Sequence, residues 1–258
     1  MRHARRRLRG ADRGHGRDQP RYGFDIRVAV VTGASSGIGA ALCHDLRAGG
    51  WRVVGLSRTP AGDADEWEEL DVGDRAAVDA VAAHVLERHP KIDLFVNNAG
   101  YSARSDFLDG DPERIEGVMR VNYLGSVWAL RAFLPGLERG AHVVNVVSVA
   151  GTVAFGPYSA SKHAQLAFSR SVAVELARRG VKVHTVLPGF VETPGFPQRE
   201  RFGGLVGRLV VDPPFVARRI LDAVDKDKRE IVVPRWYRPG TWLQALFPAT
   251  VARLRGRG

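Results

Sequence analysis

The chain has 258 residues, of which 45% are hydrophobic and 26% charged, a composition typical of one well-buried soluble domain. Its single cysteine, Cys43, excludes a disulfide scaffold and a thiolate metal cage, and no apolar run is long enough for a transmembrane helix. These features predict a cytoplasmic protein with one core and no metal site.

The net charge of +10 is concentrated at the two ends of the chain. Residues 1–27 hold nine arginines against three aspartates, and five arginines without an acidic residue follow Pro234. Residues 1–22 are polar, rich in Gly and Arg and without periodicity, which predicts a mobile N-terminal arm. A tether for nucleic acid or anionic lipid is one interpretation of this arm. A solvated tail, or a start codon assigned too far upstream, is favoured, and no specific nucleic-acid partner is predicted.

From Arg27 onward, short apolar runs alternate with helical segments. The predicted strands are Val28–Thr32, Trp51–Leu56, a short strand ending at Leu70, Ile92–Val96, His142–Val147, Val181–Leu187 and Glu230–Val233. The predicted helices are Ile38–Ala48, Arg75–Glu87, Pro112–Leu137, Ser159–Arg178 and Pro214–Val224.

Continuous apolar strands between helices are typical of a parallel sheet that is covered on both faces. With right-handed crossovers, the fold class is α/β: a single doubly wound Rossmann domain of three layers. We assign this domain to residues 23–235 and a basic, aromatic C-terminal extension to residues 236–258.

A glycine-rich turn joins the first predicted strand to the first helix. A strand that leads directly into a helix points unpaired N–H groups and the positive end of the helix dipole at one place. Glycine lets the backbone approach a diphosphate there. The turn therefore predicts a dinucleotide site, whereas a tight turn without a ligand is the alternative. The candidate binding residues are Gly33, Ser35, Ser36, Gly37, Ile38 and Gly39.

The end of the second predicted strand indicates which dinucleotide is bound. An acidic residue there would accept bonds from a free ribose 2′-hydroxyl, but this chain has Ser57 and Arg58. A small hydroxyl followed by a guanidinium leaves space for a 2′-phosphate and pairs with its charge. We therefore expect NADP(H) to be preferred over NAD(H). The alternative is that Arg58 is a solvated loop residue and the selectivity is weak.

Two further motifs complete a recognisable pattern: Asn97-Asn98-Ala99-Gly100, and Tyr158-Ser159-Ala160-Ser161-Lys162. With the glycine turn, they resemble the signature of the short-chain dehydrogenase/reductase family, from about Arg27 to about Pro234. The family commonly forms dimers or tetramers, so the resemblance implies a homodimer or homotetramer.

The resemblance also implies roles for individual residues. Asp71 and Val72 would contact the adenine ring, and Asn98, Ala99 and Gly100 would run beside the cofactor. Asn122 would kink its helix and hold a proton-relay water, and Ser148 would position the substrate. Pro188, Gly189, Val191 and Thr193 belong to the loop whose Val and Thr positions would face the nicotinamide carboxamide. Ser148 lies only ten positions before Tyr158, which we interpret as a trimmed loop at Phe155-Gly156-Pro157.

Tyr158 and Lys162 are four residues apart on a predicted helix, so their side chains project from one face. A tyrosine can exchange a proton with a carbonyl oxygen only if its pKa falls from about 10 toward the working pH. A fixed ammonium favours the phenolate, and the charge of an oxidised nicotinamide acts in the same direction. Both residues would also contact the cofactor. By contrast, His163 and Cys43 are expected to be packed or surface residues without a catalytic role.

The substrate is indicated only by apolar residues near the Pro188-Gly189 loop, in the stretch that forms a lid in the family: Phe190, Phe196, Phe202, Leu205 and Val206. They suggest a small hydrophobic alcohol or carbonyl compound, or else they pack against the core. The C-terminal aromatics and arginines are compatible with weak contact with an anionic membrane surface, a cover over the active-site mouth, or a neighbouring subunit.

Two functions from different classes follow. The favoured one is an NADP(H)-dependent oxidoreductase acting on a hydrophobic secondary alcohol, ketone or aldehyde. The other is a non-catalytic dinucleotide sensor whose arginine-rich arm contacts nucleic acid or an anionic surface. The set Asn122, Ser148, Tyr158 and Lys162 favours the enzyme, because a sensor has no use for a tunable phenol.

Overall fold

The structure is a computed structural model that describes residues 26–102, 110–154, 156–193, 198–199, 207 and 209–255. The predicted N-terminal arm, residues 1–22, lies outside the described residues. Among those described, no helix is both long enough and apolar enough to cross a membrane.

The described strands are β1 (Val28–Thr32), β2 (Arg52–Ser57), β3 (Glu66–Glu69), β4 (Leu94–Asn97), β5 (His142–Val146), β6 (Lys182–Pro188) and β7 (Glu230–Val233). They form one parallel sheet in the order β3-β2-β1-β4-β5-β6-β7, so the predicted doubly wound α/β fold is confirmed. The chain leaves β1 toward β2 and β3 and then returns to β4 on the other side. The carboxyl ends of β1 and β4 therefore border the crevice in which such sheets bind ligands.

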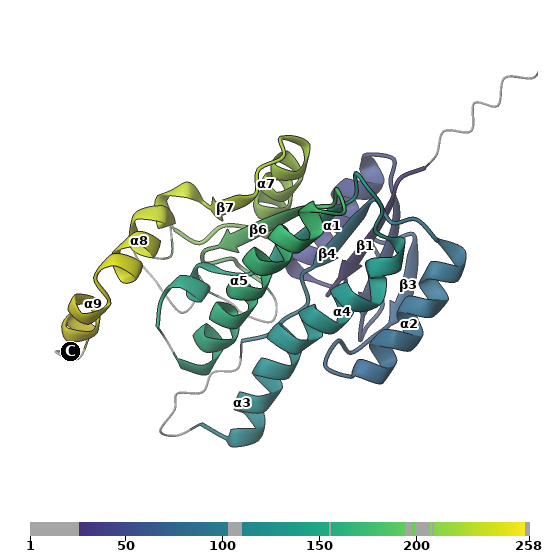
Figure 1. Cartoon of the computed structure of the whole chain (residues 1–258). Coiled ribbons are helices and arrows are strands. Elements are labelled where there is room, and N and C mark those ends of the chain that lie inside the picture. Colours follow the sequence, from purple (N-terminus) through teal and green to yellow (C-terminus); the bar gives the residue numbers. More distant parts are fainter. Residues whose placement is uncertain are drawn as a thin grey trace, which may run out of the picture.

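The described helices and helical turns are α1 (Gly37–Ala48), α2 (Arg75–Arg88), α3 (Pro112–Met119), η1 (Arg120–Leu124), α4 (Gly125–Phe133), η2 (Leu134–Gly136), η3 (Val149–Thr152), α5 (Gly156–Ala177), α7 (Pro213–Asp225), η4 (Arg235–Tyr237), α8 (Arg238–Leu246) and α9 (Pro248–Arg255). Helices α1 and α7 cover one face of the sheet, and α2, α4 and α5 cover the other (Figure 1). The sheet thus forms the middle of three layers.

Both faces of the sheet are buried, which explains why its central strands read as continuous apolar runs. Alternate residues of β1 belong to different core clusters: Val31 packs with α1 and α7, and Val30 packs with α2 and α4. In the second cluster, the rings of Phe95 and Phe133 lie with their centroids 5.1 Å apart. The core therefore anchors the central strands from two sides.

Helix starts follow their capping residues. The Asp74 side chain accepts bonds from the first-turn N–H groups of α2, and Asp111 accepts one from Glu113 before Pro112 opens α3. Helices α1 and α7 differ, because Ser36 and Asp212 at their N-cap positions make no side-chain capping bond. The glycine turn therefore ends at a helix whose first N–H groups are left without a side-chain cap.

Two features of the helices differ from the sequence-based expectation. The predicted single helix over Pro112–Leu137 is interrupted by a π-helical turn, η1, which carries Asn122. The helices α8 and α9 of the C-terminal extension are additional to the predicted elements. The proposed boundary near residue 235 stays a prediction.

Gly39 offers a direct test of how tightly α1 packs on the turn. A Cβ at this position would lie 2.1 Å from the Gly33 carbonyl oxygen and 2.7 Å from Nδ2 of Asn98. Because backbone has to move, we expect Gly39→Ala to lower the free energy of unfolding by about 1–3 kcal/mol in urea denaturation. Gly62→Ala is the control, since nothing lies within 4 Å of its Cβ. Equal stability of the two variants would contradict the packing described.

Candidate active site

The glycine turn leaves β1 and enters α1 through two residues in the left-handed region, Gly33 (φ +66°) and Gly37 (φ +57°). The Gly33 N–H donates to the carbonyl of Leu56 in β2 at 2.7 Å, which holds the turn against the neighbouring strand. Ser36 is exposed, whereas Ser35 and Ile38 are half-buried. The turn thus presents backbone N–H groups and a helix N-terminus at the carboxyl edge of the sheet.

Asn98, just after β4, holds the turn in place from the other side. Its Nδ2 donates to the carbonyls of Thr32 at 3.0 Å and Gly33 at 3.2 Å. The Thr32 hydroxyl accepts from the N–H groups of Asn98 and Ala99 at 2.9 and 3.0 Å, and it donates to the Val96 carbonyl at 3.2 Å. The two segments expected to border a cofactor are therefore one hydrogen-bonded unit.

Glycine lets the backbone of this unit pack closely against its neighbours. A Cβ at Gly33 would lie 2.9 Å from Cα of Ala99, and a Cβ at Gly37 would lie 3.0 Å from the Thr193 methyl. Gly37 therefore leaves the backbone of the turn without a side chain at the point where Thr193 faces it. Together with the uncapped start of α1, this bare backbone is the arrangement that accepts a diphosphate.

The loop after β6 closes the other side of this region. Pro188 ends β6, and the Gly189 N–H donates to the Val233 carbonyl of β7 at 2.7 Å. Val191 is buried and pairs with Val211 in an isolated bridge. The Pro188–Thr193 segment is thus held against β7 and the start of α7.

The residues expected to bind the adenosine part of the cofactor differ in exposure and in whether their side chains already form a hydrogen bond. Ser57 is buried, and its hydroxyl donates to the Thr59 carbonyl at 2.7 Å. Arg58 is exposed and contacts no partner within the described part of the chain. Val72 is buried, whereas the exposed Asp71 accepts from the Gly73 N–H at 2.8 Å. The guanidinium of Arg58 is therefore the group available to an anion here.

The π-helical turn places Asn122 at the centre of the site, fully buried. Its side-chain oxygen accepts from the Tyr101 N–H at 2.9 Å, and its Nδ2 donates to the Tyr101 carbonyl and to the Ser161 hydroxyl, both at 3.0 Å. A Cβ on Gly100 would lie 2.9 Å from this side-chain oxygen and 3.6 Å from Nζ of Lys162. Asn122 therefore links the loop after β4 to helix α5.

Ser148 and Tyr158 meet although only ten positions separate them. Ser148 is close enough to lower the pKa of Tyr158, and its hydroxyl accepts from the Ala150 N–H at 3.1 Å and donates to the Pro188 carbonyl at 3.4 Å. The short spacing is taken up by η3 and by the start of α5 at Gly156, so Gly156 and Pro157 belong to the helix. Phe155 lies outside the described residues.

Lys162 is buried below Tyr158 on α5, with its Nζ 5.9 Å from the centroid of the tyrosine ring. The ammonium donates to the side-chain oxygen of Gln165 at 2.7 Å and to the Val146 carbonyl at 3.4 Å. Burial lowers the pKa of Lys162 to about 7, and no charged group among the described residues adds to this shift.

The pKa of Tyr158 differs from the sequence-based expectation. Burial raises this pKa above its usual value, and the hydrogen bond from Ser148 offsets the rise only in part. The expected lowering by Lys162 is therefore wrong for the chain by itself, because desolvation of the phenolate dominates the shift and Lys162 does not contribute to it. At neutral pH the chain alone holds Tyr158 as a neutral phenol.

His163 and Cys43 are placed as expected. The exposed His163 has its Nδ1 2.9 Å from the Ser159 carbonyl oxygen, on the preceding turn of α5. Cys43 is buried in α1, and burial raises its pKa to about 12, which keeps the thiol protonated. Neither residue contacts the Tyr158 side chain.

The C-terminal extension reaches the site through Tyr237. A Cβ on Gly189 would lie 2.2 Å from the Tyr237 ring, and Phe190 meets the same ring edge-on at a centroid distance of 6.0 Å. Helix α8 packs against η3, which directly follows Ser148. Of the predicted lid residues, Phe196, Phe202, Leu205 and Val206 lie outside the described residues.

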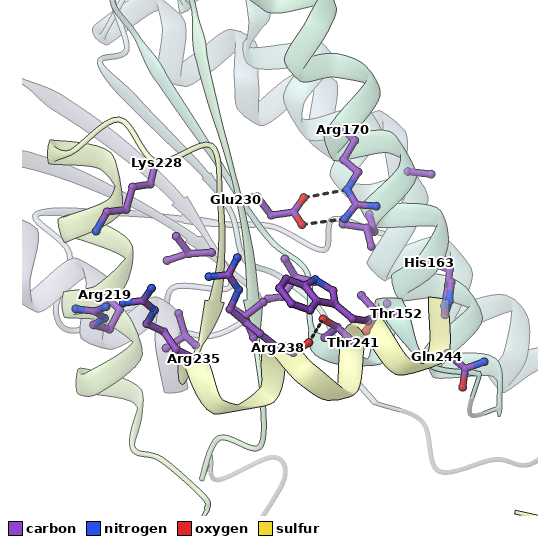
Figure 2. Close-up of a pocket in the computed structure, with 18 residues that line it drawn as sticks. Thr152, His163, Arg170, Arg219, Lys228, Glu230, Arg235, Arg238, Thr241 and Gln244 are labelled. Atoms are coloured by element: carbon purple, nitrogen blue, oxygen red, sulfur yellow. Dashed lines mark hydrogen bonds and ion pairs between the residues drawn. The ribbon is translucent and has the colours of Figure 1, made fainter. Parts of the chain in front are cut away.

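A cavity of about 760 Å³ is lined by residues of α5, α7, β7 and α8 (Figure 2). Figure 2 shows Arg170 and Glu230 paired across it, with Arg238 on α8 beside it. Arg235 and Arg238 line this cavity without an acidic partner in the described segments. This basic cavity is separate from the site that holds Tyr158, which does not line it.

Gln165, Ser126 and Tyr237 touch the site but were not among the predicted site residues. Gln165 could have been noticed as an amide one turn after Lys162 on the same predicted helix, and Ser126 as a hydroxyl one turn after Asn122. Tyr237 carries no such local signal, because 48 positions separate it from the loop that it covers.

Comparison with known proteins identifies the family. The model of the short chain dehydrogenase family matches residues 27–201. The chain therefore belongs to the short-chain dehydrogenase/reductase family and is an oxidoreductase of that family.

Relatives of known sequence agree with this assignment. The chain is 36% identical over 213 residues to an uncharacterised oxidoreductase of Staphylococcus haemolyticus, which covers 77% of this chain and 90% of that protein. It is 38% identical over 193 residues to the 2-(R)-hydroxypropyl-CoM dehydrogenase of Xanthobacter autotrophicus, covering 65% and 76% of the two chains.

Solved structures show the same fold. A short chain dehydrogenase of Burkholderia cenocepacia, in complex with NADP, has a TM-score of 0.76 at 28% identity, covering 89% of this chain and 97% of that one. A short-chain dehydrogenase/reductase of Burkholderia phymatum, in complex with NAD, has a TM-score of 0.74 at 26% identity, covering 86% and 94%.

Proposed function

We propose that the chain transfers a hydride between NADP(H) and a hydrophobic secondary alcohol, ketone or aldehyde, with Tyr158 as general acid and base. The observation that carries this proposal is the placement of Tyr158 beside Ser148, which lowers the tyrosine pKa, with Nζ of the buried Lys162 5.9 Å from the tyrosine ring. The bare glycine turn at the same edge of the sheet supports a nicotinamide dinucleotide, which two similar solved structures also bind.

The bound dinucleotide supplies or accepts the hydride. In the reductive direction, Ser148 donates a hydrogen bond to the substrate carbonyl oxygen, and the Tyr158 hydroxyl gives that oxygen its proton as the carbonyl carbon gains hydride. Tyr158 becomes a phenolate, and the ammonium form of Lys162 stabilises that negative charge. In the oxidative direction the same phenolate takes the proton of the alcohol.

The electrostatics of the site agree with this assignment of roles. Because burial raises the Tyr158 pKa and lowers that of Lys162, the chain alone favours the neutral phenol, which is the acid needed for reduction. Formation of the phenolate requires further positive charge close to the ring, as in a complex with the oxidised coenzyme.

A small cavity beside the segment that follows Ser148 supports a hydrophobic substrate. This cavity of about 230 Å³ is not lined by Ser148 or Tyr158. Its lining is mainly apolar, with two polar side chains from the C-terminal extension: Val149, Val153, Tyr237, Gly240, Thr241, Gln244 and Val251. Such a lining favours an apolar molecule with one polar group over a sugar. The C-terminal extension would then form one wall of the substrate site.

Assembly and location also belong to the proposal. We expect a cytoplasmic homodimer or homotetramer, which light scattering of the intact chain would detect as a multiple of 28.2 kDa. Trp236, Trp242, Leu246 and Phe247 of the C-terminal extension are exposed, and they support a subunit contact or a weak contact with an anionic membrane surface.

Replacing the proposed acid tests the function. In Tyr158→Phe the ring and its packing are kept but the proton is lost, so we expect kcat to fall by about 10²- to 10⁴-fold. Affinity for NADPH, measured by its fluorescence, should change little. His163→Gln, an exposed change on the same helix, serves as the control and should leave kcat unaltered. Full turnover by Tyr158→Phe would reject the proposed chemistry, and no turnover in the wild type across alcohols and carbonyls of graded chain length would favour the sensor.

Replacing Arg58 tests the choice of coenzyme. Its exposed guanidinium is expected to pair with the 2′-phosphate, so Arg58→Asp should weaken NADPH binding by about tenfold or more and improve NADH binding. Arg178→Asp makes the same charge change at an exposed position just after the end of α5 and should alter neither affinity. A wild-type protein that already prefers NADH would show that the Ser57-Arg58 interpretation is incorrect.

A further inference from the structure

A fully buried glutamine lies directly beneath the proposed active site. Gln165 follows Lys162 by three residues on α5, and both ends of its amide are bonded to side chains. Its Oε1 accepts from Nζ of Lys162 at 2.7 Å, and its Nε2 donates to the Ser126 hydroxyl at 2.9 Å. The Ser126 hydroxyl in turn donates to the backbone carbonyl of Asn122 at 2.9 Å.

The direction of these bonds follows from the lysine. An ammonium can only donate, so the glutamine must turn its oxygen toward Lys162 and its NH₂ toward Ser126. Ser126 then accepts from the amide and is free to donate to the Asn122 carbonyl. Gln165 of α5 and Ser126 of α4, 39 positions apart, are thus joined by a chain of polar groups that continues from Ser126 to the Asn122 carbonyl of η1.

We propose that Gln165 is a positioning residue for the proposed reaction: its side-chain oxygen holds the Lys162 ammonium beneath Tyr158, and Ser126 fixes the orientation of its amide. The inference rests on the proposed function only for its catalytic consequence. The hydrogen-bonded chain itself is a property of the fold.

The surroundings of Lys162 explain why an acceptor is needed. The ammonium is buried away from water, and its other acceptor among the described residues is the more distant Val146 carbonyl at 3.4 Å. Among titratable groups, the Tyr158 ring has its centroid 5.9 Å from Nζ, and His163, the next residue in the chain, is turned onto the Ser159 carbonyl. No carboxylate contributes to the Lys162 pKa. A neutral amide oxygen is therefore the main group that stabilises the charged form.

The same chain of bonds is not itself a proton path. An amide passes a proton on only through its unfavourable imidic acid form, so Gln165 holds the ammonium and does not conduct protons. Ser126 also occupies one of the two acceptor positions of the Asn122 carbonyl, to which the family resemblance assigns a relay water. The chain thus braces the backbone of η1 at that carbonyl.

Substitutions of Gln165 should move the titration of Lys162 in opposite directions. Gln165→Leu removes the acceptor, disfavours the ammonium and should lower the Lys162 pKa by about one unit. Gln165→Glu places a carboxylate beside the ammonium and should raise this pKa by at least as much. Since loss of the ammonium ends support for the phenolate, the alkaline limb of kcat/KM should move to lower pH in the first variant and to higher pH in the second.

The lysine titration can be measured without reference to turnover. The sequence contains only five lysines, so the ¹³Cε shifts of lysine-labelled full-length protein can be followed against pH, with Lys162 assigned from a Lys162→Arg variant. Ser126→Ala should move the Lys162 titration in the same direction as Gln165→Leu but by less, because it frees the amide without removing it.

Ser169→Ala is the matched control on the same helix. Ser169 is also fully buried, and it bonds to Asn145 at 3.0 Å and Thr185 at 2.7 Å without joining the chain to Lys162. It should lower stability while leaving both the titration and the alkaline limb in place.

The proposal is overturned if Gln165→Leu and Gln165→Glu titrate like the wild type at Lys162, or if Ser169→Ala produces the same shift. Should Gln165→Leu fail to fold, the direction of the shift in Gln165→Glu decides the matter. A wild type without turnover on any substrate, but with the expected lysine shifts, would reject the proposed function and leave the positioning role intact.

Discussion

A lysine ammonium removed from water needs acceptors that the protein must supply, and this need organises the centre of the molecule. Lys162 meets neutral oxygens from Gln165 and Val146, and no carboxylate. A carboxylate partner would have raised the Lys162 pKa and kept the ammonium charged at neutral pH. Neutral acceptors instead leave the Lys162 pKa close to 7, where the charge responds to changes in its surroundings.

The topology of the sheet brings the parts of the site to one edge. The glycine turn follows β1, Asn98 follows β4 and Ser148 follows β5, and these are neighbouring strands in the order of the sheet. Because Asn98 bonds the carbonyls of the turn, while Gly100 lies beside Asn122 and Lys162, one continuous backbone segment borders both the proposed coenzyme site and the lysine beneath the proposed acid. A displacement of this segment at the glycine turn would therefore also change the surroundings of Lys162, and the reverse.

Opposite pKa shifts at Tyr158 and Lys162 have one common cause, which is the removal of water from both groups. The neutral forms are favoured together, so the ionised pair is not a property of the chain alone. This makes the acid–base behaviour conditional on what else occupies the site, and it gives the buried amide of Gln165 its importance for the proposed reaction.

Local patterns in the sequence were sufficient for the strands, the doubly wound sheet, the glycine turn and the i,i+4 pair of Tyr158 and Lys162, because each depends on the spacing of residues within one or two neighbouring elements. The interruption of the long helix at Asn122, the reach of Ser148 to Tyr158 across a short gap, and the covering of Gly189 by Tyr237 were decided only by the tertiary structure. So were the raised pKa of Tyr158 and the bond from Gln165 to Ser126. These features depend on burial and on contacts between residues tens of positions apart, and neither leaves a periodic signal in the sequence.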